Sequence, residues 1–179
     1  MNEQIFFYLN SFVGHSILFD FLIVFFATYF GYFFLGLVFY EEFFRSKESK
    51  EKRRNNLAYL FMILVGATIA YFLSQIINNL YPTPRPDLVF SSVINIMGKT
   101  GMDSFPSGHA TFFFALAFLF YSNYKKYFYP ALLVAILTAI SRIIGGAHWP
   151  VDILGGMLLA FIVSLVLNPL FGKIHRLFR

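Results

Sequence analysis

Four side chains in this sequence are of the types that bind and transfer an anion: the histidines His109 and His148 and the arginines Arg85 and Arg142. Arginine presents a planar fork of N–H donors that matches the oxygens of phosphate. No cluster of acidic residues accompanies the four, and the chain has no cysteine. The set therefore indicates an anion site and speaks against a metal centre built from carboxylates or thiolates.

The segment around the first histidine has the pattern of an anion-binding helix start. Ser107-Gly108-His109 follows Pro106 directly and opens an apolar stretch. A helix N-terminus offers unpaired backbone N–H groups and a partial positive charge to an anion. Gly108 would let the backbone approach the anion closely, and the Ser107 hydroxyl would add a donor.

The second histidine is accompanied by a carboxylate. His148 precedes Trp149-Pro150, and a helix is predicted to begin here because proline is favoured in the first helical turn. Asp152 lies in that turn, four residues beyond His148. A carboxylate there can hold one ring nitrogen as N–H and leave the other free to attack. His148 is therefore a candidate nucleophile, oriented by Asp152.

The elements that must position these residues are apolar. Hydrophobic residues make up 58% of the chain, which has 26 phenylalanines among its 179 residues. Five stretches are apolar all round rather than on one face, as in membrane-spanning helices. They are Ile17–Tyr40, Leu57–Leu80, Gly108–Tyr121, Tyr127–Ile144 and Val151–Leu170. We predict an all-α, polytopic membrane helix bundle with five transmembrane helices, formed by a single domain over residues 1–179.

The first 16 residues predict a different kind of helix. Apolar side chains at Ile5, Phe6, Leu9, Phe12 and Val13 share one face at helical spacing. The stretch is too short to cross a bilayer, so we expect an N-terminal interfacial amphipathic helix.

The basic residues predict which way the bundle faces. With five spans, 11 of the 14 lysines and arginines fall on one side, in the segment 41–56, in the turn at Lys125 and after the last span. Short loops rich in lysine and arginine stay cytoplasmic. The N-terminus and the loop 81–106 are therefore expected outside, with the C-terminus inside. The net charge of +5 follows from this topology and gives no reason to expect a nucleic-acid partner.

Three motifs resemble the signature of the type 2 phosphatidic acid phosphatase family. They are Arg85-Pro86; Pro106-Ser107-Gly108-His109; and Ser141-Arg142, followed after five residues by His148 and after three more by Asp152. The third motif matches each defining position at the family's spacing. All three lie on the predicted outer face.

The resemblance implies a role for each residue. His148 would take the phosphoryl group and Asp152 would orient it, while His109 would protonate the leaving group and then activate water. Four further residues would cradle the phosphate oxygens and the developing charge. They are Arg85, Ser107, Gly108 and Arg142. The resemblance implies neither a metal nor another cofactor.

One position departs from the family's pattern. A lysine normally stands seven residues before the arginine of the first motif, and here that position is Asn78. Asparagine still donates hydrogen bonds, so Asn78 is kept among the phosphate-binding candidates, but it brings no charge. Either two arginines suffice, or Lys99 reaches in from the outer loop. We interpret Lys99 as a solvated loop charge.

Other polar residues are given structural interpretations. Asp20 is expected to pair with a nearby donor, and Asp87 and Asp103 are interpreted as loop residues rather than metal ligands. Gly145 and Gly146 are expected to form the tight turn that brings Arg142 and His148 together.

The resemblance predicts hydrolysis of a phosphate or diphosphate group from a membrane lipid at the outer face of a bacterial inner membrane. Undecaprenyl diphosphate and lipid A 1-phosphate rank ahead of phosphatidylglycerophosphate and phosphatidate. The expected partners are the lipid substrate and the bilayer, and no obligatory protein partner is evident. Two other functions stay open: a vanadium haloperoxidase-like enzyme and a non-catalytic lipid transporter.

Overall fold

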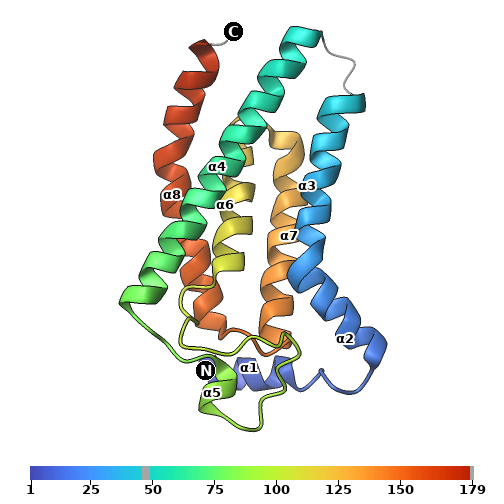
Figure 1. Cartoon of the computed structure of the whole chain (residues 1–179), viewed down its shortest axis with the longest axis vertical. Coiled ribbons are helices and arrows are strands. Elements are labelled where there is room, and N and C mark those ends of the chain that lie inside the picture. Colours follow the sequence, from blue (N-terminus) through green and yellow to red (C-terminus); the bar gives the residue numbers. More distant parts are fainter. Residues whose placement is uncertain (46–48, 178–179) are drawn as a thin grey trace.

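The computed structural model describes residues 1–45 and 49–177, and all its regular elements there are helices. In chain order they are α1 (Asn2–Asn10), α2 (Ile17–Val24), the π-helical η1 (Phe25–Tyr29), α3 (Phe30–Tyr40), the π-helical η2 (Glu41–Arg45), α4 (Lys50–Leu80), α5 (Pro86–Val89), α6 (Gly108–Asn123), α7 (Lys125–Ile144) and α8 (Pro150–Leu177). The long helices run side by side as one bundle (Figure 1). The predicted all-α fold is confirmed.

Four helices are long and apolar enough to cross a bilayer: Ile17–Arg45, Lys50–Leu80, Lys125–Ile144 and Pro150–Ile174. The first comprises α2, η1, α3 and η2, so the predicted first span is interrupted by π-helical turns. Side chains such as Leu158 and Leu165 are exposed on the outside of the bundle. An apolar exterior fits a protein surrounded by lipid, and we describe the chain as a membrane protein.

The predicted third span, α6, is shorter and lies inside the bundle. It packs against α4, α7 and α8, and most of its side chains from Ala110 to Phe120 are buried. Its 16 residues make about 24 Å of helix, less than the roughly 30 Å of a bilayer core. Because its neighbours shield it from lipid, α6 can end within the bundle. Its N-terminus carries the second motif.

Helix α1 lies across one end of the bundle (Figure 1). It ends at Asn10, so Phe12 and Val13 of the predicted apolar face lie beyond the helix. The Phe6 ring packs 4.8 Å from the Trp149 ring, centroid to centroid. Asn10 donates through Nδ2 to the carbonyl oxygens of Ile94 (2.9 Å) and Ile144 (2.8 Å), and its Oδ1 accepts the N–H of Ile94. The helix therefore ties the loop after α5 to the end of α7.

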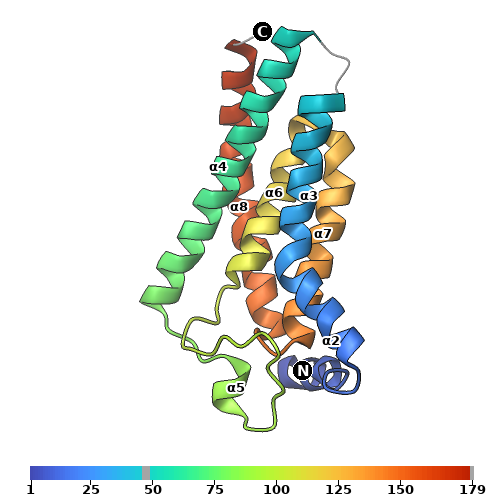
Figure 2. The same cartoon turned by 45° about the vertical axis from the view of Figure 1, so that its right-hand side comes forward.

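The loop 81–107 is at the same end of the bundle as α1 (Figure 2). Its two arms are joined by backbone hydrogen bonds: Thr83 N–H donates to Met102, Arg85 N–H to Gly101, and Ser104 N–H to Thr83. This pairing places Arg85 beside Asp103, far from it in sequence. The first two motifs are thereby brought to the end of the bundle where the third lies.

The opposite end is fixed by a buried carboxylate that the sequence analysis did not single out. Glu42 accepts hydrogen bonds from Lys126 Nζ, Tyr127 Oη and Asn56 Nδ2. These partners come from α7 and α4. One glutamate thus joins three transmembrane segments at the end where the basic residues gather.

Candidate active site

A small cavity at the loop end of the bundle is lined by the residues that were predicted to bind and transfer the anion. Its volume is about 60 Å³, and a single water needs only roughly 10–15 Å³, so a small anion in place of a few waters is a reasonable occupant. The lining residues come from all three motifs. They are Tyr71, Gln75, Asn78, Arg85, Lys99, Asp103, Gly108, His109, Arg142 and His148. Both predicted arginines and both predicted histidines therefore meet in one place.

The two arginines are buried cations that leave donors free. Arg85 is only 3% exposed; its Nε donates to Asp103 Oδ1 at 2.8 Å and its Nη1 to the carbonyl of Ala147 at 2.9 Å. Arg142 is 5% exposed, and its Nε has no hydrogen-bond partner in the described part of the chain. A buried cation with an unpaired N–H donor is costly unless an anion joins it. These arginines therefore have the arrangement expected of an anion site.

The start of α6 supplies further unused donors. Ser107 precedes the helix as its N-cap, but its side chain makes no capping hydrogen bond. Its Oγ is buried and has no partner among the described residues. At Gly108 a Cβ would lie 2.9 Å from Gln75 Nε2 and from the Tyr71 ring, so a side chain would crowd the cavity wall. Backbone N–H groups of the first turn lack helical partners, which adds to the attraction for an anion.

The hydrogen bonds of His148 select one tautomer. Its Nδ1 lies 3.0 Å from the carbonyl oxygen of Ser104, and because a carbonyl only accepts, Nδ1 must carry the proton. Nε2 of the neutral ring is then unprotonated and has the lone pair of a nucleophile. Burial, together with the nearby charges of Arg142 and Arg85, lowers the pKa of His148 to about 4, although Asp152 opposes the shift. The ring is therefore neutral near pH 7.

Asp152 supports His148 mainly through Ser104 rather than by a direct hydrogen bond. Its Oδ2 is 3.6 Å from His148 Nδ1, beyond the distance of a good hydrogen bond. The same oxygen accepts from Ser104 Oγ at 2.5 Å and from the backbone N–H of Trp149 at 2.8 Å. Asp152 thus holds Ser104, whose carbonyl holds the histidine. Ser104 was missed by the sequence analysis, because a serine before Phe105-Pro106 carries no signal of its own.

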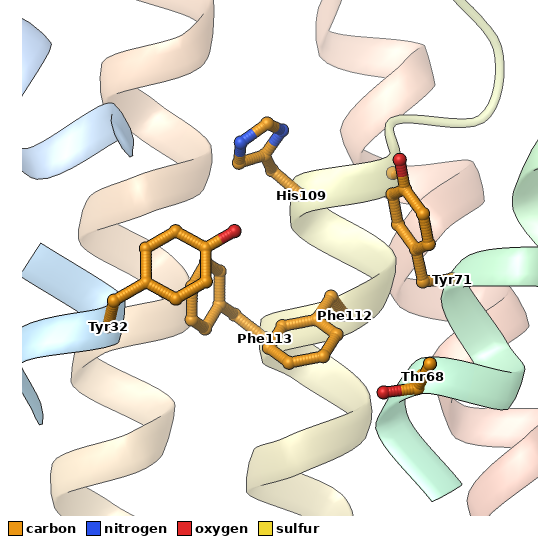
Figure 3. Close-up of a pocket in the computed structure, with 7 residues that line it drawn as sticks. Tyr32, Thr68, Tyr71, His109, Phe112 and Phe113 are labelled. Atoms are coloured by element: carbon orange, nitrogen blue, oxygen red, sulfur yellow. The ribbon is translucent and has the colours of Figure 1, made fainter. Parts of the chain in front are cut away.

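His109 lies where the polar cavity meets an apolar groove. This groove, about 180 Å³ in volume, shares Tyr71, Gly108 and His109 with the cavity. Its other lining residues are Tyr32, Thr68, Phe112 and Phe113. Figure 3 shows the His109 ring at one edge, with Tyr32 from α3 and Tyr71 from α4 on opposite sides. The site therefore offers charged and apolar surfaces to one ligand, with His109 between them.

Asn78 and Lys99 both line the cavity, but they have different partners: a backbone carbonyl for Asn78 and a carboxylate for Lys99. Asn78 is buried and donates through Nδ2 to the carbonyl of Pro106 at 3.3 Å, so its amide holds the segment that precedes α6. Lys99 Nζ lies 2.5 Å from Asp103 Oδ2. The interpretation of Lys99 and Asp103 as loop residues is therefore incomplete, since Asp103 bridges Lys99 and Arg85. These two hydrogen bonds hold the pKa of Asp103 well below its usual range, even though burial opposes this shift.

Two structural interpretations are confirmed. Asp20 accepts a hydrogen bond from the backbone N–H of Gly14. Gly146 has a φ of +80°, and a Cβ there would lie 2.5 Å from the carbonyl oxygen of Ile94. Only glycine suits this turn, which links Arg142 to His148.

Comparison with known proteins places the chain in a family. The PAP2 superfamily matches residues 55–176. The chain is 31% identical over 103 residues to the undecaprenyl-diphosphatase BcrC of Bacillus subtilis, covering 58% of this chain and 51% of that protein. It is 32% identical over 127 residues to a lipid A 1-phosphatase of Rhizobium johnstonii, covering 68% and 50%.

A third relative has a name of another kind. The bacitracin transport permease protein BcrC of Bacillus licheniformis is 29% identical over 160 residues, covering 87% of this chain and 75% of that protein. The chain thus spans about half the length of the first two curated relatives and three quarters of the third.

A solved structure agrees with the fold. The crystal structure of Aquifex aeolicus LpxE superposes with a TM-score of 0.67 at 26% identity, covering 92% of this chain and 93% of that one. The superfamily match includes all three motifs and the helices that carry them. This chain belongs to the PAP2 superfamily.

Proposed function

We propose that this chain is a membrane lipid phosphatase that removes a phosphate or diphosphate-derived phosphoryl group through a phosphohistidine at His148. The observation that carries the proposal is the unpartnered pair of buried donors, Arg142 Nε and Ser107 Oγ, in the described part of the chain. Arg142 and Arg85 line the cavity together with His148 and His109, and so does Gly108, which directly follows Ser107. Such a set of preorganised donors is what phosphoryl transfer requires.

The reaction has two displacements. Nε2 of His148 attacks phosphorus, and the bond from phosphorus to the leaving oxygen breaks with its electron pair passing to that oxygen. His109 protonates the leaving oxygen. Water then attacks the phosphohistidine while His109 accepts a proton, the P–N bond breaks, and orthophosphate leaves. Arg85, Arg142 and Ser107 stabilise the charge on the non-bridging oxygens in both steps.

The apolar groove supports a lipid substrate. It adjoins the cavity at His109, on the side where the leaving group must depart. Tyr32, Phe112 and Phe113 would contact the hydrocarbon next to the head group. Undecaprenyl diphosphate and lipid A 1-phosphate are the first candidates, because relatives named for these activities are 31% and 32% identical to this chain over the matched residues. Phosphatidylglycerophosphate and phosphatidate are the alternatives.

The proposed location is a bacterial inner membrane, with the cavity on the outer side. The basic turn at Lys125 lies at the end of α7 opposite the cavity, and basic loops remain cytoplasmic. The chain has no cysteine, so a single cysteine at the exposed Ser92 gives a clean test. It should react with an impermeant maleimide in intact cells. Labelling only after the membrane is opened would show that the cavity faces the cytoplasm instead.

Two other functions remain to be tested. A haloperoxidase needs bound vanadate and a path for halide and peroxide, and the apolar groove favours a lipid instead. A lipid transporter would use the same cavity without chemistry. The name of one relative, a transport permease, keeps this second function under test. A transporter gives no role to a histidine whose tautomer leaves Nε2 free to attack.

The test is phosphate release by the purified full chain in detergent, from a panel of lipid phosphates and diphosphates. We expect release with at least one of these lipids, and none above background from His148→Ala. The exposed histidine His15 provides the matched control, and His15→Ala should retain wild-type rates. Activity that persists in His148→Ala, or an absence of hydrolysis while lipid is moved in vesicles, would reject the proposal.

A further inference from the structure

Lys99 is the one cation of the described cavity wall that the reaction above does not use. The inference here rests on the proposed function and concerns the substrate class of the same site. We propose that Lys99 is a specificity-determining residue, whose ammonium binds the second phosphate of a lipid diphosphate. It would thereby favour diphosphates over monophosphates of the same lipid.

The first support is the connection between Lys99 and a phosphate-binding arginine. One carboxylate joins the two, since Asp103 accepts from Lys99 Nζ through Oδ2 and from Arg85 Nε through Oδ1. Without Asp103, a lysine in an exposed loop would be free to turn into water. The carboxylate therefore holds the ammonium at a fixed place beside the guanidinium.

The second support is that Lys99 lies nearer the surface of the protein than the two arginines do. Arg85 and Arg142 are almost fully buried, whereas the Lys99 side chain is 59% exposed and still lines the cavity. The arginines thus form the floor and Lys99 stands at the mouth. A terminal phosphate on the floor, within reach of His148, would leave the second phosphate of a diphosphate toward the mouth.

The third support is the number of free donors. An ammonium has three N–H donors, and Asp103 uses one of those on Lys99, so two remain for a phosphate oxygen. Asn78 is less suited to this role, because it is uncharged and one of its two amide N–H donors is used by Pro106. Among the described residues of the cavity wall, the cations are Arg85, Arg142 and Lys99. Lys99 is therefore the cation that remains for additional negative charge.

The direction of the leaving group agrees with this assignment. In a displacement by His148, the leaving oxygen lies opposite Nε2, near the proton donor His109. For a diphosphate, that oxygen belongs to the second phosphate, and for a monophosphate it belongs to an alcohol. Only the diphosphate places anionic oxygens there for Lys99 to bind. A charge-assisted hydrogen bond to such an oxygen would strengthen as negative charge develops on it.

The experiment compares a prenyl diphosphate with the prenyl monophosphate of the same chain length. Lys99→Met removes the charge and keeps a long side chain, Lys99→Arg keeps the charge, and Lys50→Met removes a lysine at the opposite end. We expect Lys99→Met to lower kcat/KM for the diphosphate by on the order of tenfold or more. The loss for the monophosphate should be under about threefold. Lys99→Arg should restore most of the diphosphate preference, and Lys50→Met should match wild type.

Salt dependence separates a charge contact from a structural effect. The KM of the wild type for the diphosphate should rise more steeply with ionic strength than the KM of Lys99→Met. Equal losses for both substrates, or unchanged rates for both, would overturn the role of Lys99 while leaving the phosphatase proposal intact. Absence of hydrolysis by wild type, or hydrolysis by His148→Ala, would instead overturn the proposed function.

Discussion

The backbone carbonyl of Ser104 accepts a hydrogen bond from Nδ1 of His148 at 3.0 Å. The Oγ of the same serine donates to Asp152 Oδ2 at 2.5 Å. A single residue thus fixes the tautomer of the histidine and anchors the carboxylate beside it. Because Ser104 directly precedes the segment that begins α6, it also couples the second motif to the third.

Ser104→Ala should therefore impair catalysis without removing any group that touches substrate. The carbonyl remains, but Asp152 loses a hydrogen bond of the charged kind, worth about 1.5–3 kcal/mol. We expect kcat to fall by on the order of 10- to 100-fold with little change in KM. Steady-state kinetics on the purified protein would measure this. Ser92→Ala, in the exposed part of the same loop, is the control, and equal rates for the two variants would refute the role of Ser104.

The charge state of His148 can be measured directly. Its pKa, lowered by burial to about 4, lies below the 6.5 of a free histidine, so the ring should stay neutral from pH 8 to about pH 5. The unfolded chain binds this proton near pH 6.5 and the folded chain does not, so His148 lowers stability as pH falls from 6.5 toward 4. Imidazole ¹⁵N NMR in detergent, with His148→Gln for assignment, would follow the titration. A midpoint near 6.5 would mean that the site is more open to water than the structure indicates.

The buried Glu42 should contribute to stability rather than activity. Glu42→Gln keeps the size but weakens the contacts with Lys126 and Tyr127. We expect a loss of about 1–3 kcal/mol in the free energy of unfolding, because the buried Tyr127 hydroxyl and the half-exposed Lys126 ammonium lose a charged acceptor. Unfolding in a denaturing detergent titration would measure it, with the exposed Glu41→Gln as control. A large fall in kcat at unchanged stability would contradict this structural role.

The absence of a metal requirement stays a prediction. We expect phosphate release to persist in EDTA, because the chemistry proposed here uses histidine and arginine side chains. Vanadate should inhibit by occupying the phosphate cradle around Arg85 and Arg142. Loss of activity in the chelator, with recovery on adding magnesium or zinc, would show that the mechanism is incomplete.

The sequence predicted the features of the fold and of the candidate site that are local in the chain, but not the contacts between distant residues. Uninterrupted apolar stretches predicted the long helices, and the spacing from His148 to Asp152 predicted their proximity, because both features are local. The pairing of the loop arms, which brings Asp103 to Arg85, is not local and had no signal in residue type. The same holds for Ser104, whose importance comes from which carbonyl His148 meets, and for Glu42, whose partners lie 14 to 85 residues away.

The two histidines should have different roles in the reaction. His109→Ala keeps the nucleophile but loses the proton donor, a contribution on the order of 10²–10⁴-fold. A substrate with a stable leaving anion, such as a nitrophenyl phosphate, should partly restore its first step. His148→Ala should stay inactive with every substrate.

Trapping of the intermediate tests this claim most directly. The purified variants would be mixed with substrate labelled in the transferred phosphate and quenched within seconds. We predict that His109→Ala accumulates acid-labile, base-stable label that mass spectrometry places on His148, because water is not activated to release it. His148→Ala should hold no label. Label on His109 in the His148→Ala protein, with none on His148 in the His109→Ala protein, would contradict the account and exchange the two roles.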